Sequence, residues 1–351
     1  MKTNLHKLAQ RTIRHYIRKD DTVVVAPLNW GLGHATRCTP LIQYLKERGN
    51  KIIIASDGEA LELLKKEFPE LPAESLPGYG IKYYSGNMIF NLLFSFPGML
   101  SGLLREKSAL EKIVLKYSAH VVLSDNRPAA LSGKTMNIYL THQINIIFTN
   151  KWLRNIAGSF HQYYIRKFDT CWIPDERGKN NITGSMGYPT GLRDFHYIGN
   201  LTRIHKINAD LKYDICVLIS GPEPQKSILS EALARILFSQ KEYRIIWITS
   251  GTLKEMPSPI PEHIELHTMA DSRITEYALN ESKLLISRSG YSTIMDIMQL
   301  KIKAIFIPTP GQPEQEYLAE SLKQNARFIT LHQSEIDKLK TLIESVLQDF
   351  D

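Results

Sequence analysis

The hydrophobic positions of this chain form short apolar runs, separated by longer stretches with a helical period. The first run, at 22–27, is followed by a glycine-rich turn, an amphipathic stretch at 35–46 and a second run at 51–55. A strand, a helix and a strand in this order predict a βαβ unit, and hence a parallel sheet. Further strands are predicted at 120–124, 136–140 and 170–173.

The pattern is interrupted at 174–193, where turn residues dominate, and then begins again. A second series of strands is predicted at 214–220, 244–249, 262–267, 283–287, 303–307 and 327–330. A chain of 351 residues exceeds the size at which a single core keeps growing. We therefore predict an α/β protein with two doubly wound, Rossmann-like domains at 1–200 and 201–351. We expect the last helix to pack back on the first domain, and a ligand to bind in a cleft at the carboxyl ends of the strands.

The cysteines and the N-terminal residues indicate the compartment. Cys38, Cys171 and Cys216 are scattered, without the spacing of a disulfide framework or a metal site, which favours a reducing environment. Residues 1–20 are rich in lysine and arginine and contain no long apolar run, so no signal peptide is apparent. A cytoplasmic protein is expected.

The net charge of +7 predicts an anionic partner. No nucleic-acid-binding motif accompanies the charge, so a membrane is the better hypothesis. Residues 83–104 carry no charge, but a break at Pro97–Gly98 argues against a spanning helix and for an interfacial one. Basic residues in a predicted N-terminal arm, and at Lys151, Arg154, Arg166 and Lys167, are suited to anionic headgroups. The alternative is that 83–104 forms buried helices of the first domain.

The turn after the first strand contains a candidate catalytic residue. Gly31 and Gly33 allow the backbone to approach a ligand closely, and His34 begins the helix that follows. A histidine at the carboxyl edge of a sheet can serve as a general base near neutral pH. The turn does not complete the G-x-G-x-x-G pattern of a dinucleotide site, since Thr36 follows.

Two later strands end in polar residues that belong at the same edge of the sheet. Asp125 ends the run at 121–124 and is a candidate to orient His34 through its other ring nitrogen. The alternative is that Asp125 caps the turn at 126–128. His142 follows another strand and is a candidate for the acceptor side of the site.

The second half contains a candidate phosphate site. The apolar run at 284–286 ends in a small, hydroxyl-rich turn that opens a helix, where backbone N–H groups and the helix dipole favour an anion. Asp296 follows Ser292 and Thr293 on the same helical face and can hold two vicinal hydroxyl groups. A phosphate next to a diol indicates a nucleotide.

These residues resemble the donor-binding half of glycosyltransferase family 28, the family of the peptidoglycan N-acetylglucosaminyltransferases. In that family a strand leads into R-S-G, a carboxylate then binds the nucleotide ribose, and a later Q-Q or Q-E pair meets the donor. Arg288, Ser289 and Gly290 fall in these places, as do Asp296, which replaces the usual glutamate, and the pair Gln315 and Glu316. The resemblance implies a GT-B fold and a nucleotide-sugar donor, for which we predict a UDP-sugar.

The resemblance extends to two further loops. The turn at 31–34 is similar to the acceptor-side turn of families 28 and 1, and family 1 implies a His-Asp dyad, here His34 and Asp125. Family 28 also places a small-residue loop against the donor diphosphate, which corresponds here to the loop with Gly221; its prolines remove N–H donors. The D-x-D pattern occurs only at Asp349 and Asp351, so we expect no bound metal, and no cofactor is implied. Arg288 and helix dipoles would then supply the positive field.

The sequence thus predicts an inverting, metal-independent glycosyltransferase that works peripherally at the inner face of the cytoplasmic membrane, in the synthesis of cell envelope polysaccharide. The acceptor is expected to be membrane-borne or a glycan. An alternative is a hydrolase, because the segment 31–38 also resembles the G-H-x-x-R-C turn of the UDP-sugar hydrolase of pseudaminic acid biosynthesis. A third possibility is a nucleotide-sugar-binding regulator without chemistry, for which His34 would be dispensable.

Overall fold

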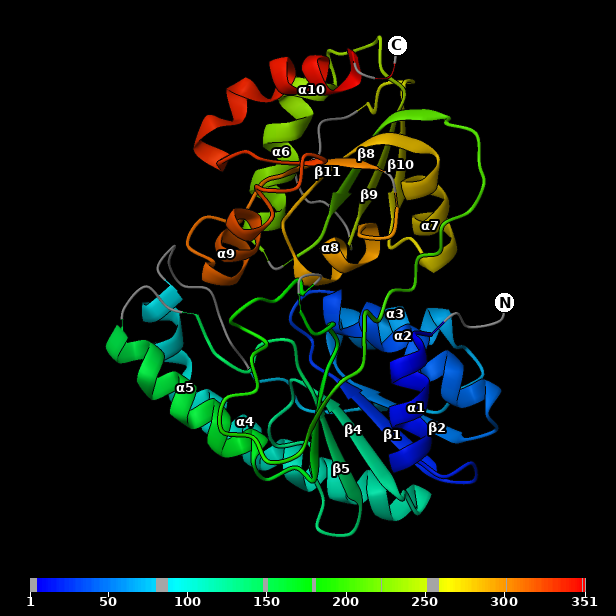
Figure 1. Cartoon of the computed structure of the whole chain (residues 1–351), viewed down its shortest axis with the longest axis vertical. Coiled ribbons are helices and arrows are strands. Elements are labelled where there is room, and N and C mark those ends of the chain that lie inside the picture. Colours follow the sequence, from blue (N-terminus) through cyan, green and yellow to red (C-terminus); the bar gives the residue numbers. More distant parts are fainter. Residues whose placement is uncertain are drawn as a thin grey trace. The chain divides into compact units, whose positions relative to one another are not determined.

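The structure is a computed structural model of the chain (Figure 1). It describes residues 5–79, 88–147, 151–178, 181–221, 223–250, 259–300, 302–348 and 350, with the backbone alone at 88–100, 151 and 153. The chain forms two compact units, here called the first and the second domain. Residues 1–30 and 34–202 form the first domain, and residues 203–351 form the second together with 31–33.

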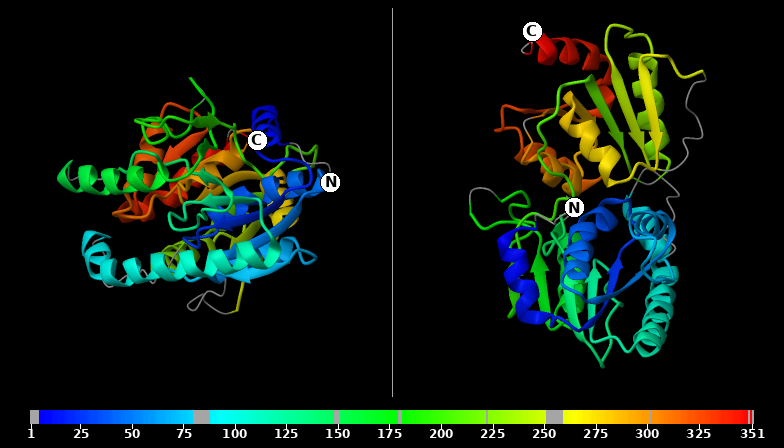
Figure 2. Two further views of the ribbon diagram at one scale, coloured as in Figure 1. Left: turned by 90° about the horizontal axis from the view of Figure 1, so that it is seen from below. Right: turned by 90° about the vertical axis from the view of Figure 1, so that its right-hand side faces the viewer.

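The first domain is built on a parallel sheet. Its strands in the described residues are β1 (Thr22–Pro27), β2 (Lys51–Ser56), β3 (Ala73–Ser75), β4 (Val121–Asp125), β5 (Met136–Leu140), β6 (Thr170–Ile173) and β7 (Phe195–Tyr197). They lie in the order β3-β2-β1-β4-β5-β6-β7. The helices are α1 (Lys7–Tyr16), α2 (Gly33–Glu47), α3 (Gly58–Glu67), α4 (Met88–Tyr117) and α5 (Lys151–Ile165). All residues of β1 are buried, as expected where helices cover both faces of a sheet (Figure 2).

The second domain repeats this architecture. Its described strands are β8 (Tyr213–Ile219), β9 (Ile245–Thr249), β10 (Ile264–Thr268), β11 (Ser282–Ser287), β12 (Lys303–Phe306) and β13 (Phe328–Thr330), all parallel, in the order β10-β9-β8-β11-β12-β13. Its helices are α6 (Gln225–Leu237), α7 (Ser272–Asn280), α8 (Tyr291–Ile297), α9 (Pro313–Ser321), the 3-10 helix η1 (Gln333–Lys338) and α10 (Leu339–Gln348). The α/β fold class is therefore as predicted, and the predicted strands occur within one or two residues of their expected bounds.

Each sheet has one topological switch point. The chain order reverses between β1 and β4 in the first sheet and between β8 and β11 in the second. Loops that leave neighbouring strands there run in opposite directions, so the carboxyl edge is open between them and is the usual ligand site of such folds. The predicted site residues follow these four strands or their neighbours.

The helices bear on three features noted in the sequence. The basic N-terminal arm forms helix α1, and Ala9 and Ile13 on its apolar face are fully buried. Helix α4 continues through Pro97 and Gly98, so the predicted break is absent. The buried residues of α10, among them Leu339 and Ile343, belong to the core of the second domain, and packing of this helix on the first domain stays a prediction.

The apolar segment at 83–104 is described only in part. We predicted that this segment either faces lipid or is buried. Up to residue 100 its side chains lie outside the described part of the structure, so the prediction stays open there. Beyond that point Leu103 packs with Tyr79 and Ala129, whereas Leu104 is exposed. No helix in the part of the chain that the structure describes has both the length and the apolar character needed to cross a bilayer.

Candidate active site

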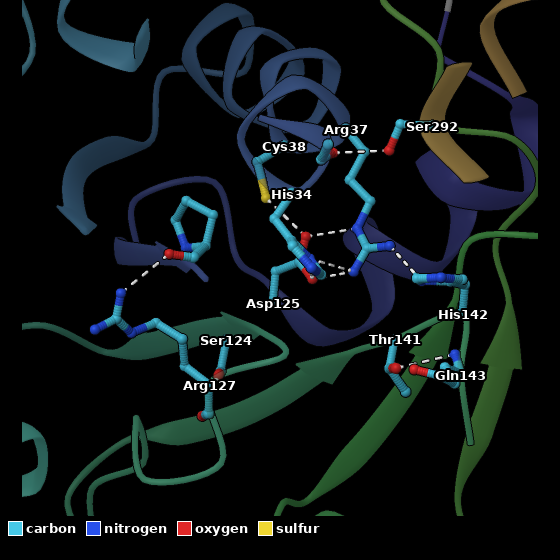
Figure 3. A network of polar contacts seen from close by, with 12 residues as sticks. His34, Arg37, Cys38, Ser124, Asp125, Arg127, Thr141, His142, Gln143 and Ser292 are labelled. Atoms are coloured by element: carbon cyan, nitrogen blue, oxygen red, sulfur yellow. Dashed lines mark hydrogen bonds and ion pairs between the residues drawn. The ribbon is translucent and has the colours of Figure 1, made fainter. Parts of the chain in front are cut away.

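The first polar cluster lies at the switch point of the first sheet. His34 is the second residue of α2, and Asp125 is the last residue of β4. Asp125 is in register with Pro27, the last residue of β1, so the loop into α2 starts beside the carboxylate. His34 Nδ1 and Asp125 Oδ1 are 2.9 Å apart (Figure 3). The structure thus brings together the two residues that the sequence proposed as a catalytic pair.

Two further residues of α2 reach the same carboxylate. Residues 34, 37 and 38 share one helix face, because positions three and four apart lie on the same side of a helix. Arg37 donates from Nε to Asp125 Oδ2 at 2.6 Å and from Nη2 to Oδ1, a two-pronged ion pair. Cys38 Sγ lies 3.5 Å from Oδ2. Both Arg37 and Asp125 are buried.

The turn after β4 does not use Asp125 as its cap. Instead Ser124 Oγ donates to the carbonyl oxygen of Arg127 at 2.6 Å, and Asn126 adopts a left-handed φ of 55°. The side chain of Asp125 is free to point into the cluster. Between the two alternatives that the sequence left open, the geometry favours the pair with His34.

His142 belongs to the same cluster. It follows β5, the neighbour of β4, and its Nδ1 lies 2.6 Å from Arg37 Nη1. The centres of the His34 and His142 rings are 6.5 Å apart. Arg37 therefore joins the candidate base to the candidate acceptor-side residue.

A second buried ion network fixes the loop that follows β4. Arg127 is fully buried and donates to Glu106, to Asp57 Oδ1 at 2.7 Å and to the carbonyl oxygen of Pro77 at 2.8 Å. Tyr79 donates to Glu106. Each charge has a partner within the network, so it is a structural element that holds three segments of the first domain together.

In the second domain Arg288 follows β11 at the switch point, and its guanidinium points into the protein. Nη1 donates to the carbonyl oxygens of Ile307 and Pro308 and to Gln333 Oε1 at 2.8 Å. Nη2 donates to the carbonyl oxygen of Gln225 at 2.9 Å. These acceptors are neutral, so Arg288 ties four segments together and leaves a buried positive charge among the described residues there.

Lys226, in the first turn of α6, is a second buried cation at this edge. Its Nζ donates to the carbonyl oxygen of Ser250 at 2.8 Å and lies 3.3 Å from Glu223 Oε1. Gly221 lies two residues after β8 and has a φ of 117°, a conformation that only glycine adopts without strain.

The helix that carries the predicted ribose-binding residue is short. Gly290 precedes α8 and provides no side-chain cap, and Ser289 Oγ donates to the carbonyl oxygen of Gln315 at 2.8 Å. Asp296 is buried. Ser292 and Thr293 are partly exposed on the first turn, and binding of the ribose by Asp296 stays a prediction.

The Q-E pair organises its own loop. Gln315 Oε1 accepts from the backbone N–H of Thr309 at 2.8 Å, and Glu316 Oε1 accepts from that of Gly311 at 3.0 Å. Both side chains thus shape the loop between β12 and α9. Their contact with a donor stays a prediction.

Comparison with known families decides the assignment of the second half. Residues 230–351 match the glycosyltransferase family 28 C-terminal domain. The chain carries a family 28 domain. The resemblance stated from R-S-G, Asp296 and the Q-E pair is therefore confirmed, and the chain is assigned to the glycosyltransferases.

Curated relatives match over most of the chain. It is 23% identical over 331 residues to a transferase of Pasteurella multocida, covering 91% of this chain and 86% of the relative. That protein is named UDP-N-acetylglucosamine–N-acetylmuramyl-(pentapeptide) pyrophosphoryl-undecaprenol N-acetylglucosamine transferase. An uncharacterized glycosyltransferase of Methanosarcina acetivorans is 24% identical over 347 residues, covering 91% and 86%.

Solved structures confirm the GT-B fold of this chain. Spinosyn rhamnosyltransferase SpnG superimposes with a TM-score of 0.62 at 11% identity, covering 93% of this chain and 91% of that one. The calicheamicin glycosyltransferase CalG4 gives a TM-score of 0.60 at 12% identity, covering 93% and 90%.

The electrostatics of the first cluster set its protonation state. Burial alone would raise the pKa of Asp125, but Arg37 and His34 reverse this and hold that pKa below its usual range. Burial lowers the pKa of His34, with Arg37 acting in the same direction and Asp125 against it. Burial also raises the pKa of Cys38 well above its usual value. Near neutral pH the cluster therefore holds an ionised Asp125, a neutral His34 and a thiol.

This protonation state is that of a general base. A neutral His34 that donates from Nδ1 to Asp125 carries its lone pair on Nε2, ready to accept a proton. The negative charge of Asp125 next to it would stabilise an imidazolium formed there.

Sequence reasoning missed the roles of Arg37 and Lys226. Arg37 stood in the motif shared with the hydrolase, but only its i, i+3 spacing from His34 hinted at a common partner. Lys226 gave no signal, because a lysine near a helix start looks like a surface residue until the fold buries it.

Proposed function

We propose that this glycosyltransferase moves a sugar from a nucleotide sugar, a UDP-sugar, to a hydroxyl group of a membrane-borne acceptor, with inversion and without a metal. The observation that carries the proposal is the contact of His34 with the buried, ionised Asp125 at the switch point of the first sheet. A base held in this way is what a hydroxyl nucleophile requires.

In the proposed reaction the acceptor hydroxyl oxygen attacks the anomeric carbon of the donor sugar. Its proton passes to His34 Nε2, while the bond from the anomeric carbon to the diphosphate oxygen breaks. The diphosphate leaves with the electron pair, and one displacement inverts the anomeric centre. Asp125 keeps the imidazole ring oriented and stabilises the positive charge that it gains.

The second domain is proposed to bind the donor. Arg288 places a buried positive charge at its switch point, Lys226 adds a buried ammonium group paired with Glu223, and α6 begins at the same edge. Positive charge in a weakly polar environment stabilises a diphosphate that gains negative charge as it leaves. This field supports a leaving group that needs no divalent ion. The donor and the lipid-linked acceptor in the name of the Pasteurella multocida relative support UDP-linked and lipid-linked substrates for this chain.

The outer face of α5 supports contact with a membrane. Trp152, Ile156, Phe160 and Tyr163 are exposed and follow a helical spacing that places them in one stripe. Arg154, Arg166 and Lys167 are exposed along the same segment. An apolar stripe rich in aromatic residues and flanked by cations is typical of helices that lie at the surface of an anionic bilayer.

Product analysis tests the reaction. The protein is incubated with UDP-N-acetylglucosamine and a polyprenyl-pyrophosphate-linked saccharide, in the presence of EDTA. We expect UDP and an extended lipid-linked product with an inverted anomeric linkage, and only slow release of free sugar when the acceptor is omitted. Stoichiometric release of free sugar at the same rate with or without acceptor would instead establish the hydrolase, and loss of transfer in EDTA would contradict the metal-independent reaction.

Flotation with vesicles tests the membrane contact. The triple variant Trp152→Ser, Ile156→Ser, Tyr163→Ser is expected to lose its binding to phosphatidylglycerol vesicles while its melting temperature hardly changes, because the three side chains are exposed. Leu211→Ser, Ile228→Ser, Tyr277→Ser is the matched control, since these apolar residues are exposed on the second domain. Equal flotation of both triple variants would remove α5 from the membrane contact.

A further inference from the structure

Arg37 contacts three titratable side chains at once. Its guanidinium meets Asp125 through two nitrogens, His142 Nδ1 through Nη1 at 2.6 Å, and His34 Nδ1 through Nη2 at 2.9 Å. Only 1% of the arginine is exposed. A guanidinium can donate hydrogen bonds but cannot accept them. The position of the proton on His142 follows from this restriction, and that on His34 follows from the carboxylate of Asp125.

The contact with Arg37 fixes the tautomer of His142. At 2.6 Å from a donor-only nitrogen, His142 Nδ1 has to be the acceptor and therefore carries a lone pair. A ring with its lone pair on Nδ1 carries its proton on Nε2.

The contact with Asp125 fixes the opposite tautomer at His34. Asp125 Oδ1 already accepts from Arg37 Nη2, and it lies 2.9 Å from His34 Nδ1. His34 Nδ1 also lies 2.9 Å from Arg37 Nη2, so both a donor and an acceptor face it. We assign the proton to Nδ1, because Nη2 already donates to Asp125 Oδ1 and a lone pair on Nδ1 would face the lone pairs of the ionised carboxylate. The lone pair of neutral His34 is then on Nε2.

We propose that Arg37 is a positioning residue that holds His142 with an N–H on Nε2, the opposite of His34, which Asp125 holds with a lone pair there. Combined with the proposed function, on which this role rests, His34 is the base and His142 is a hydrogen-bond donor to an oxygen atom. Without Arg37, His142 loses the contact that fixes its tautomer, whereas His34 keeps Asp125.

The charged and titratable groups that face His34 within the first domain are Asp125 from β4, Arg37 and Cys38 from α2, and His142 after β5. Arg37 lowers the pKa of His34 after the larger effect of burial, and Asp125 opposes both. Loss of Arg37 therefore raises the pKa of His34. The neutral base would then form only at higher pH.

Nitrogen NMR of the histidine rings tests the tautomers without any reaction. In the wild-type protein we expect His142 Nδ1 and His34 Nε2 to show the shifts of unprotonated nitrogens, with assignments from His34→Gln and His142→Gln. In Arg37→Met the His142 signals should move to the average of two exchanging tautomers. Protonated Nδ1 at His142 in the wild-type protein would overturn the proposal even if no Arg37 variant folds.

Two further variants distinguish the positioning role of Arg37 from an effect of its loss on folding. Arg37→Lys keeps the charge but offers a single nitrogen, so it should hold one of the three partners and restore the spectrum only in part. Arg127→Lys is the matched control, because Arg127 is equally buried in the same domain and contacts carboxylates but no histidine. Identical histidine spectra in wild-type and Arg37→Met protein, or the same changes in Arg127→Lys, would contradict the role of Arg37.

The pH profile of transfer links the tautomers to the reaction. Arg37→Met should lower kcat roughly 10- to 100-fold, the usual effect of losing a residue that orients a functional histidine, and move the acidic limb of the profile to higher pH. Arg37→Lys should recover part of kcat. An unchanged acidic limb in Arg37→Met would contradict the proposal. Full activity of His34→Ala alongside the expected NMR spectra would instead refute the proposed base and leave the tautomers assigned.

Discussion

The two switch points of this protein are built on opposite charges. In the first domain the buried charge is the carboxylate of Asp125, and it is neutralised by Arg37 and hydrogen-bonded by the residue that would do the chemistry. In the second domain the buried charge is the guanidinium of Arg288, and its acceptors are neutral carbonyl and amide oxygens. The first arrangement favours a proton acceptor, whereas the second leaves a positive field for an anion.

The difference shows how one architecture supports two tasks. Both sheets are parallel and reverse their order at one point, so the fold alone would not distinguish a catalytic from a binding edge. The distinction comes from the sign of the charge that is buried there and from its partners. The predictions below test whether chemistry and binding are in fact divided in this way.

The largest effect is expected from His34→Ala. A positioned base contributes roughly a hundred- to ten-thousandfold to a rate, so kcat should fall by that order. Nucleotide affinity, which is assigned to the second domain, should not change in a thermal-shift titration with UDP. Asp125→Asn should lower kcat less, because the imidazole remains in place. Normal kcat in His34→Ala, or weaker UDP binding, would contradict the division of catalysis and nucleotide binding between the two domains.

Asp296→Ala should produce the converse result. Hydrogen bonds to a charged group contribute about 1.5–3 kcal/mol, so UDP affinity should fall roughly 10- to 100-fold by that estimate. Because the ribose contact exists before and during the reaction, the loss should appear in KM and leave kcat at saturation nearly unchanged. Unaltered UDP affinity in this variant would refute the ribose assignment.

A smaller effect concerns acid stability. Burial lowers the pKa of His34, and burial lowers that of His161, also in the first domain, to about 4. A histidine whose pKa is lower in the folded state binds fewer protons there than in the unfolded state. Its contribution to the free energy of unfolding is therefore fully present above its unfolded pKa of about 6.5. That contribution is lost as the pH falls toward the folded pKa. Hydrogen exchange at pH 7.5 and 5 should therefore show a greater loss of protection in the first domain of the wild-type protein than in that of His161→Gln. Equal losses in both proteins would contradict this effect.

Most of the sheet framework and one contact of the candidate active site could be predicted from sequence. Buried parallel strands are nearly continuous apolar runs, so β1, β4, β8 and β11 stand out. Their carboxyl ends share an edge, and this is why His34 and Asp125 could be paired across 91 positions. The sequence left open whether Asp125 pairs with His34 or caps the turn that follows. Only the folded turn decides this, because there the hydroxyl group of Ser124 makes the hydrogen bond.

The rest depends on tertiary context that a linear pattern does not carry. Arg37 looks like a surface cation until the fold supplies its acceptors. Arg288 could be assigned to the second site from sequence, but its carbonyl and amide acceptors could not. The many cations of helix α1 hide a narrow apolar face in the sequence. The short strand β7 follows a turn-rich stretch and pairs with β6 in the described part of the chain. Helix α4 passes through Pro97, where propensity predicted a break.

The three buried cysteines allow the opening of each domain to be measured separately. Cys38 and Cys171 lie in the first domain and Cys216 in the second, and all are buried. Burial raises the pKa of all three thiols, that of Cys216 to about 12. Because the thiolate is the form that reacts with alkylating reagents, the native protein should stay unlabelled until a domain opens. The mass added at each cysteine then records, in a single sample and without any engineered probe, which half of the enzyme opens first.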